Sequence, residues 1–227
     1  MLRAILLLKY LWYSLAYFYI CHFDKTMSRL KIANTNETID KIIEDKCSIG
    51  RFGDGEFYII MNKPDASRFQ CNDAALAKRL QEVLIKPLDH FLVSIPLSWK
   101  STSGLKMYAK LFWKSFVAEN RHFLSASLST NRQYYNTQIT RFYIDYRHPF
   151  VGKETSSRLK RIWEKQDILI IEGEHSKLGI GNDLFDDCNS VKRIICPSKN
   201  AFASYDKILS SAKKYGKDKL ILIALGM

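Results

Sequence analysis

The chain has 227 residues, of which 47% are hydrophobic and 13% aromatic, so it can bury a sizeable core and is not generally disordered. The formal net charge is +12, from 35 basic and 23 acidic residues, which favours an anionic partner: a phosphorylated small molecule, an acidic membrane surface or nucleic acid. The five cysteines form no C-x-x-C pair. This scatter argues against a zinc site or a disulfide framework and favours a reducing cytoplasm.

Residues 1–23 form an apolar, aromatic segment interrupted only by Arg3, Lys9 and His22. The segment reaches the length of a membrane-spanning helix, but Lys9 in its middle suits a helix that lies in the membrane interface better. The alternative is a helix packed on the following domain or on a second copy of the chain, which leaves a homo-oligomer open. We expect residues 1–30 to be a hydrophobic helix and linker, associated with the inner face of the cell membrane.

Residues 27–38 are polar and typical of a linker, in which Asn36 or Thr38 is expected to cap the following helix. An apolar approach then ends at residues 49–57 in a turn with two glycines, one arginine and two carboxylates. Glycine lets a ligand approach the main chain, and hard carboxylate oxygens suit Mg²⁺ or Mn²⁺. An ordinary surface turn has a similar composition, so the pattern alone leaves both interpretations open.

The middle of the chain contains several periodic segments. Apolar spacing and alternation predict a helix at 73–84, a strand at 91–95, a helix at 103–123, a strand at 138–144 and a basic helix at 156–165. The aromatic stripe of the second helix is typical of a core face rather than of a nucleic-acid platform.

The last third of the chain has three continuous apolar runs, at 167–171, 192–196 and 219–225, with a helix predicted near 200–215. Such runs are typical of buried parallel strands, so we expect an α/β fold with a Rossmann-like sheet flanked by helices. Ligands of such sheets bind beyond the carboxyl ends of the strands. Gly179 and Gly181 resemble the start of a dinucleotide fingerprint, but Leu184 replaces its third glycine and excludes that site.

Several blocks of the chain together resemble the GT-D-type glycosyltransferase family, from about residue 39 to residue 226. The blocks are Arg51-Phe52-Gly53-Asp54-Gly55-Glu56-Phe57, Thr140-Arg141-x-Tyr143, Glu172-Gly173-Glu174, Gly181-Asn182-Asp183-Leu184-Phe185 and Arg193-Ile194-Ile195-Cys196-Pro197 with Asn200-Ala201-Phe202. Phe142 stands where the family pattern has proline. Family members continue beyond the point at which this sequence stops, so we expect residues 31–227 to be a GT-D-type domain that is incomplete at its C-terminus.

The resemblance implies a metal-dependent enzyme that moves a sugar from a nucleotide donor, commonly UDP-linked, to a cell-surface glycan or glycoprotein. It implies that Asp54 and Glu56 bind Mn²⁺ or Mg²⁺ with the donor diphosphate, and that Glu172 or Glu174 is the general base. The residues implied for donor binding are Arg51, Phe52, Gly53, Asn182, Asp183 and Asn200.

Two other functions stay open at this point. The expected C-terminal gap would suit a truncated, non-catalytic nucleotide-binding or scaffold protein. The net charge of +12 would suit a nucleic-acid-binding protein, but the chain has no helix-turn-helix, zinc-finger or RNA-binding signature, so we expect no nucleic-acid partner.

Overall fold

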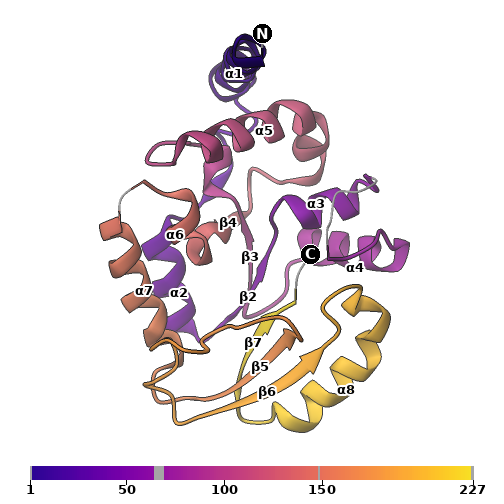
Figure 1. Ribbon diagram of the computed structural model, residues 1–227. Coiled ribbons are helices and arrows are strands. Elements are labelled where there is room, and N and C mark those ends of the chain that lie inside the picture. Colours follow the sequence, from indigo (N-terminus) through magenta and orange to yellow (C-terminus); the bar gives the residue numbers. More distant parts are fainter. Residues whose placement is uncertain (1, 64–68, 148, 226–227) are drawn as a thin grey trace. The chain divides into compact units, whose positions relative to one another are not determined.

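The computed structural model describes residues 2–63, 69–147 and 149–225 (Figure 1). The chain divides into two compact units. Unit 1 contains Met1–Asp54 and Glu82–Thr155, and unit 2 contains Gly55–Gln81 and Ser156–Met227. Each unit has its own parallel β-sheet. The protein is therefore a mixed α/β fold, with two parallel sheets where the apolar runs had predicted one.

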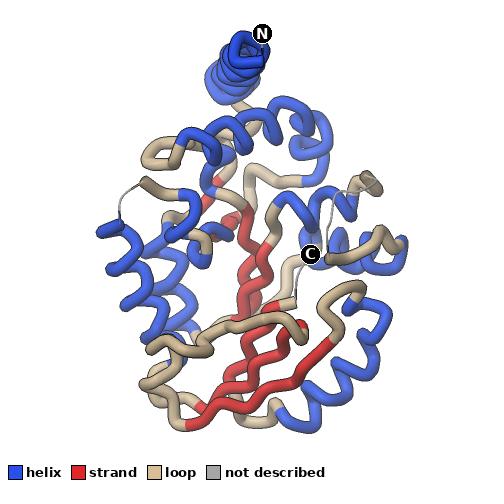
Figure 2. Tube along the Cα trace, in the orientation of Figure 1, coloured by secondary structure: helices blue, strands red, loops and turns tan. Residues whose placement is uncertain are grey.

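The sheet of unit 1 has the strand order β1-β4-β3-β2, and all its pairs are parallel. Figure 2 shows the strands in red and the helices in blue. Its strands are β1 (Lys31–Ile32), β2 (Ser48–Arg51), β3 (Phe91–Ile95) and β4 (Gln133–Asn136). The predicted strand at 91–95 is thus confirmed, and it ends before Pro96, which cannot donate to a ladder. Because all four strands run the same way, their carboxyl ends share one edge of this sheet.

The predicted strand at 138–144 is wrong. This segment instead forms two short helices, η3 (Thr137–Thr140) and α6 (Phe142–Asp145), directly after β4. The alternation of apolar and polar residues is misleading because Gln138 is buried as well as Ile139, and its side chain accepts from the backbone N–H of Ser98. The strand prediction assumed that polar residues face solvent, but a polar residue can be buried where its hydrogen bonds are satisfied.

Helix α2 (Thr35–Asp45) is capped by Asn34, so the expected caps Asn36 and Thr38 are wrong. The Asn34 side chain accepts from the backbone N–H of Glu37 at 3.0 Å, and Glu37 accepts from the backbone N–H of Asn34 at 2.8 Å. This reciprocal capping box satisfies two N–H groups that a helix start otherwise leaves unpaired. It was visible in the sequence as an asparagine followed three residues later by glutamate.

Helix α1 (Leu2–Tyr19) continues into the π-helical turn η1 (Ile20–Asp24) and packs on α5 (Met107–Ser127). No helix among the described residues is long and apolar enough to cross a membrane. Beneath α5, the buried ring of Trp99, in η2 (Leu97–Trp99), stacks on Phe116 with ring centroids 5.7 Å apart. The aromatic stripe predicted for this helix is a core face only in part, because Phe116 is buried whereas Tyr108 and Phe112 are 54% and 40% exposed.

Unit 2 has the parallel strand order β6-β5-β7. Its strands are β5 (Asp167–Gly173), β6 (Ser190–Cys196) and β7 (Leu220–Ala224). The three predicted apolar strands are confirmed, and the central one, β5, is buried along almost its whole length. Both faces of β5 are covered, so neither face carries polar side chains, which explains the continuous apolar run.

One face of this sheet packs against α8 (Tyr205–Tyr215), which follows η4 (Ala201–Ser204). Leu169 and Ile171 form the centre of this contact with Cys196, while Ile223 on the edge strand β7 is 70% exposed. The remaining helices are α3 (Asp54–Ile60), α4 (Ala74–Ile85) and α7 (Pro149–Trp163). Asp73 caps α4, as expected for an acid at a helix start, by accepting from the N–H groups of Ala75 and Leu76.

Candidate functional site

The turn with two carboxylates begins where β2 ends. The backbone N–H of Phe52 donates to the Ser94 carbonyl at 2.9 Å, which extends the pairing of β2 with β3 by one residue. A Cβ at Gly50 would lie 2.6 Å from the Phe91 ring, so only glycine fits there. After Gly53 the chain enters α3 at Asp54. The turn therefore lies at the carboxyl edge of the unit 1 sheet.

Arg51 is the last residue of β2, and its side chain is exposed at this edge. Its Nε atom donates to the carbonyl of Thr137 at 3.1 Å, directly after β4. This contact fixes the guanidinium across the ends of the sheet. A guanidinium has five N–H donors and a permanent positive charge, and this chemistry suits an anionic ligand.

A buried polar network supports the same edge, and it was not expected from the sequence. The side-chain oxygen of Asn136 accepts from the backbone N–H groups of Leu97 at 3.4 Å and Gln138 at 2.9 Å. The Gln138 side chain accepts from the N–H of Ser98 at 3.0 Å, and Asp145 accepts from Arg141 at 3.3 Å. Asn136, Gln138 and Asp145 are all at most 2% exposed. Buried and satisfied amides of this kind hold loops in one conformation.

Asp54 and Glu56 lie in the first turn of α3 and are half-buried. Asp54 is the first residue of α3 and Glu56 the third, so each supplies its own carboxylate oxygens at the helix start. Within the described ranges, no group of three or more His, Cys, Asp or Glu side chains could hold a metal ion. The protein therefore offers two carboxylates at most, which fits Mg²⁺ or Mn²⁺ only as ions that take their remaining ligands from water or phosphate.

The strand ends of unit 2 carry the other predicted residues. Glu172, on β5, is 1% exposed and forms an ion pair with Arg193 on β6. The Arg193 guanidinium also donates to the carbonyl of Leu178 at 2.9 Å. Oε2 of Glu172 has no hydrogen-bond partner among the described residues. The pair holds the loop after β5 to the sheet. Because Glu172 is buried, its carboxylate does not face solvent, where a ligand would bind.

Glu174 lies two residues further along and has a very different environment. Its side chain is 56% exposed, and its Oε1 lies 3.3 Å from the Ser198 hydroxyl and 3.4 Å from Nε2 of His175. Its backbone N–H donates to the carbonyl of Cys196 at 2.9 Å, which ties it to the end of β6. An exposed carboxylate next to an imidazole and a hydroxyl is placed to exchange a proton with a ligand.

Asn200 also lies at this edge, in the left-handed conformation with φ 51°. Its backbone N–H donates to the carbonyl of Phe69 at 2.7 Å, and its side-chain oxygen accepts from the N–H of Cys71 at 2.7 Å. The Gln70 side chain between them accepts from the N–H of Phe202 at 3.2 Å. Asn200 thus clamps residues 69–71 onto the end of β6.

Asn182 and Asp183 lie on the exposed loop between β5 and β6. The Asn182 side chain accepts from the N–H of Leu184 at 3.0 Å, which closes the turn. Asp183 accepts from Lys160 on α7 at 2.5 Å. That hydrogen bond, together with the attraction of the ammonium charge, lowers the pKa of Asp183. Both side chains therefore already have local partners.

The structure brings the predicted residues together in two sets. In unit 1, Arg51, Phe52, Gly53 and Asp54 share the end of β2. In unit 2, Glu174 lies beside Ser198, with Asn200 two residues beyond. Sequence reasoning missed Asn136, Gln138 and Ser198; the signal for the first two was a run of polar residues directly after an aromatic strand.

Two parallel sheets with polar turns at the carboxyl ends of their strands define an α/β protein of the class that binds ligands at those ends. Comparison with known families narrows this class. The family model "Glycosyltransferase GT-D fold" matches residues 49–227. The chain belongs to this family, as the sequence blocks had suggested.

Relatives and solved structures agree with this assignment. The glycosyltransferase GlyD of Streptococcus pneumoniae serotype 4 (strain ATCC BAA-334 / TIGR4) is 33% identical over 204 residues, covering 89% of this chain and 25% of the relative. The probable glycosyl transferase Gly of Streptococcus gordonii is 35% identical over 203 residues, covering 87% of this chain and 29% of the relative. The chain thus spans less than a third of these proteins.

A solved structure of the domain of unknown function 1792, described as having a distinct glycosyltransferase fold, superposes with a TM-score of 0.84 at 35% identity. The match covers 88% of this chain and 72% of that one. A second solved structure, a new glycosyltransferase with the same domain from Streptococcus sanguinis, gives a TM-score of 0.79 at 32% identity, covering 87% and 73%. The fold of this chain is therefore a glycosyltransferase fold.

Proposed function

We propose that this chain transfers a sugar from a UDP-linked donor to a cell-surface glycan or glycoprotein, in a reaction that requires Mn²⁺ or Mg²⁺. The observation that carries the proposal is the turn from Arg51 to Glu56 at the carboxyl end of β2, in a chain of the GT-D family. The relatives named as glycosyltransferases support the reaction class. The carboxylates and the arginine of the turn support a divalent cation and a diphosphate as ligands.

Asp54 and Glu56 are the residues that would hold the divalent cation, each through carboxylate oxygens. The ion would neutralise charge on the diphosphate as it leaves the sugar. The absence of a third metal-binding side chain among the described residues suits this arrangement, because diphosphate oxygens then complete the shell. Arg51, fixed by Thr137, would bind the same diphosphate by charge-assisted hydrogen bonds.

Glu174 is the general base that we propose, in preference to Glu172. A base must reach the acceptor hydroxyl, and Glu174 is exposed whereas Glu172 is buried and paired with Arg193. We assign Glu172 the positioning role of holding the loop after β5. We also propose that the reaction takes place at the inner face of the cell membrane, where nucleotide-sugar donors and lipid-linked acceptors are both accessible.

A turnover assay tests the reaction. The purified chain, with Mn²⁺ and a panel of sugar nucleotides, should release nucleotide from one donor class. Asp54→Asn and Glu56→Gln should each lower kcat/KM at least about 100-fold, since each loses part of the transition-state charge stabilisation. Glu44→Gln, an exposed carboxylate on α2, is the matched control and should have wild-type activity. Turnover that survives both substitutions would contradict the proposed site.

A further inference from the structure

Helix α1 is held to its neighbours α5 and η2 by several polar contacts. The Tyr17 hydroxyl donates to the carbonyls of Ser98 and Trp99, both at 3.1 Å. The Tyr13 hydroxyl donates to Glu119 on α5 at 2.5 Å. These bonds fix the rotation of α1 about its axis, because Tyr13 must face α5 while Tyr17 faces η2.

Lys114 of α5 adds to the same attachment. Its ammonium donates to the Ser14 hydroxyl at 3.1 Å and lies 5.3 Å from the centre of the Tyr10 ring. The turn η1 then buries Ile20 and Cys21. The inner face of α1 therefore carries most of its hydroxyl groups, and its position is set at four successive turns.

The opposite face of α1 is apolar and faces solvent. We call it the apolar stripe; its residues recur every three or four positions and therefore share one side of the helix. They are Leu7 (60% exposed), Leu8 (65%), Leu11 (49%), Trp12 (68%), Leu15 (67%), Phe18 (52%) and Tyr19 (53%). Phe23, 68% exposed, continues the stripe into η1.

This arrangement is the reverse of an ordinary surface helix, which buries its apolar face and exposes its polar one. Single exposed apolar side chains are common, but eight in one contiguous row mark a surface that binds something. The packing on α5 cannot be turned over to hide the stripe, because the Tyr13 and Tyr17 bonds would break. The stripe is therefore a surface presented to a partner.

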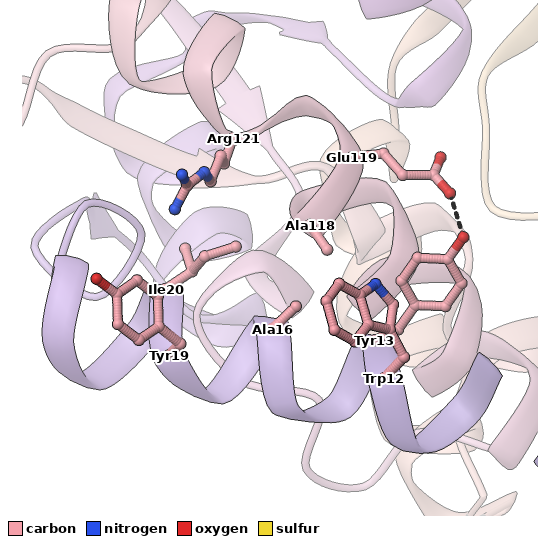
Figure 3. Close-up of a pocket in the computed structure, with 8 residues that line it drawn as sticks. All are labelled: Trp12, Tyr13, Ala16, Tyr19, Ile20, Ala118, Glu119 and Arg121. Carbon is pink, nitrogen blue, oxygen red and sulfur yellow. Dashed lines mark hydrogen bonds between the residues drawn. The ribbon is translucent and has the colours of Figure 1, made fainter. Parts of the chain in front are cut away.

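A hollow of about 300 Å³ lies beside the stripe, between α1 and α5 (Figure 3). Trp12 and Tyr19 of the stripe contribute to its lining, and Glu119 and Arg121 of α5 form its polar side. Arg121 lies 3.8 Å from Asp24 and remains 36% exposed. An apolar hollow with an accessible guanidinium at its rim suits an amphiphile with an anionic head.

Charge around the stripe has one dominant sign. The first 31 residues contain five basic residues, Arg3, Lys9, Lys25, Arg29 and Lys31, and one acidic residue, Asp24. Lys9 and Lys25 are exposed next to the stripe, and the whole chain carries +12. Basic groups beside an aromatic, apolar helix face are the features that bind helices to the surface of anionic bilayers.

We propose that the apolar stripe docks this protein on the surface of a bilayer containing anionic phospholipid, with α1 lying in the plane of the interface. Tryptophan and tyrosine favour this depth, since their rings are apolar and their N–H and O–H groups stay hydrated. No described helix is long and apolar enough to span, so the attachment is peripheral. This inference stands on α1 alone and does not depend on the proposed glycosyl transfer.

Tryptophan fluorescence can report this contact from one position. Of the four tryptophans, Trp99, Trp113 and Trp163 are buried at 0%, 4% and 8% exposure, and only Trp12 faces solvent. The probe is a vesicle of phosphatidylcholine with about 30 mol% of the anionic lipid phosphatidylglycerol. Adding these vesicles should shift the tryptophan emission to shorter wavelength. Trp12→Phe should abolish the shift, and an unchanged shift in that variant would overturn the assignment.

Vesicle flotation measures the binding itself. Leu11→Gln combined with Leu15→Gln should lower the partition coefficient at least about tenfold, because each leucine loses its burial in the bilayer. Both side chains face solvent, so the melting temperature should stay within about 2 °C of wild type. The matched control is Ile85→Gln with Leu88→Gln, two similarly exposed residues (54% and 48%) away from α1, which should bind as wild type.

A second experiment tests whether binding depends on the charge of the lipid. Lys9→Gln should lower binding to the anionic vesicles about fivefold, since each basic residue near such a surface contributes about 1 kcal/mol. Equal binding to anionic and neutral vesicles would overturn the charge part of the proposal. Absence of flotation, with a concentration-dependent dimer that the Leu11/Leu15 variant abolishes, would overturn the proposal in favour of a second copy of the chain.

Discussion

The strand ends of the two sheets are stabilised in opposite ways. In unit 1, hydrogen-bonded neutral amides, Asn136 and Gln138, are buried beneath the turn that carries Arg51 and Asp54. In unit 2, one buried ion pair, Glu172 with Arg193, holds the loop that carries Glu174. Neutral amides that satisfy several N–H groups fix a backbone closely, whereas a single ion pair fixes one point. We infer that the edge of the unit 1 sheet is the more rigid of the two.

The largest expected effect is at the ion pair. Arg193→Met should lower the free energy of unfolding by about 3–5 kcal/mol, because it leaves the Glu172 carboxylate buried without a counter-charge. Urea denaturation measures the loss. Glu172→Met with Arg193→Met is the control and should recover most of it, since an apolar pair needs no desolvation of charge. A double variant as unstable as the single one would contradict the ion-pair explanation.

The amide network should come second. Asn136→Ala removes the acceptor of two backbone N–H groups and should cost about 2–3 kcal/mol, measured by the same denaturation. Asn189→Ala is the matched control, an exposed asparagine whose amide donates to the Lys165 carbonyl in unit 2; it should cost less than about 1 kcal/mol. Equal losses would remove the distinction between the two edges.

The cap of α2 should have a smaller effect. Asn34→Ala should cost about 1 kcal/mol because it removes the capping box at the helix start, next to the Thr35 and Thr38 hydroxyls that contact Asn136. The measurement is the thermal midpoint. Asn36→Ala, two residues further along, is the control and should change stability by less than about 0.5 kcal/mol. The reverse order would show that the cap lies at Asn36.

The smallest effect is expected at Asp183. Its folded-state pKa is lowered by the Lys160 hydrogen bond and charge. The pair therefore contributes stability above the unfolded-state pKa of about 4, and this stability is lost as the pH falls through the lower folded-state value. Lys160→Met should match wild type in stability at acid pH and fall slightly below it at neutral pH. Thermal midpoints at several pH values measure this; a variant that differs most at low pH would contradict it.

Regular elements of this chain follow from its sequence because burial is periodic there. The apolar runs of β5, β6 and β7 and the spacing in α5 predicted their structure. The division into two sheets was not predictable, since a strand pattern does not specify which strands pair. The prediction of a strand after β4 failed because Gln138 is buried and hydrogen-bonded. The sequence does not show which polar residues are buried in this way.

The candidate site was predictable where it depends on local chemistry. The turn from Arg51 to Glu56 was found from its glycines and carboxylates, and its position at the end of β2 agrees with that expectation. The difference between Glu172 and Glu174 was not predictable, since both follow the same apolar run. Only pairing with Arg193 on the neighbouring strand separates the buried carboxylate from the exposed one.

One measurement tests the central claim, that the turn binds a metal–nucleotide diphosphate. UDP with Mn²⁺, at about 100 times its dissociation constant, should stabilise the chain by about 2.7 kcal/mol and raise Tm by roughly 5–10 °C. Asp54→Ala with Glu56→Ala should abolish the shift while leaving the Tm without ligand near that of wild type. A shift of equal size in that variant, or none in the wild-type chain, would contradict the account.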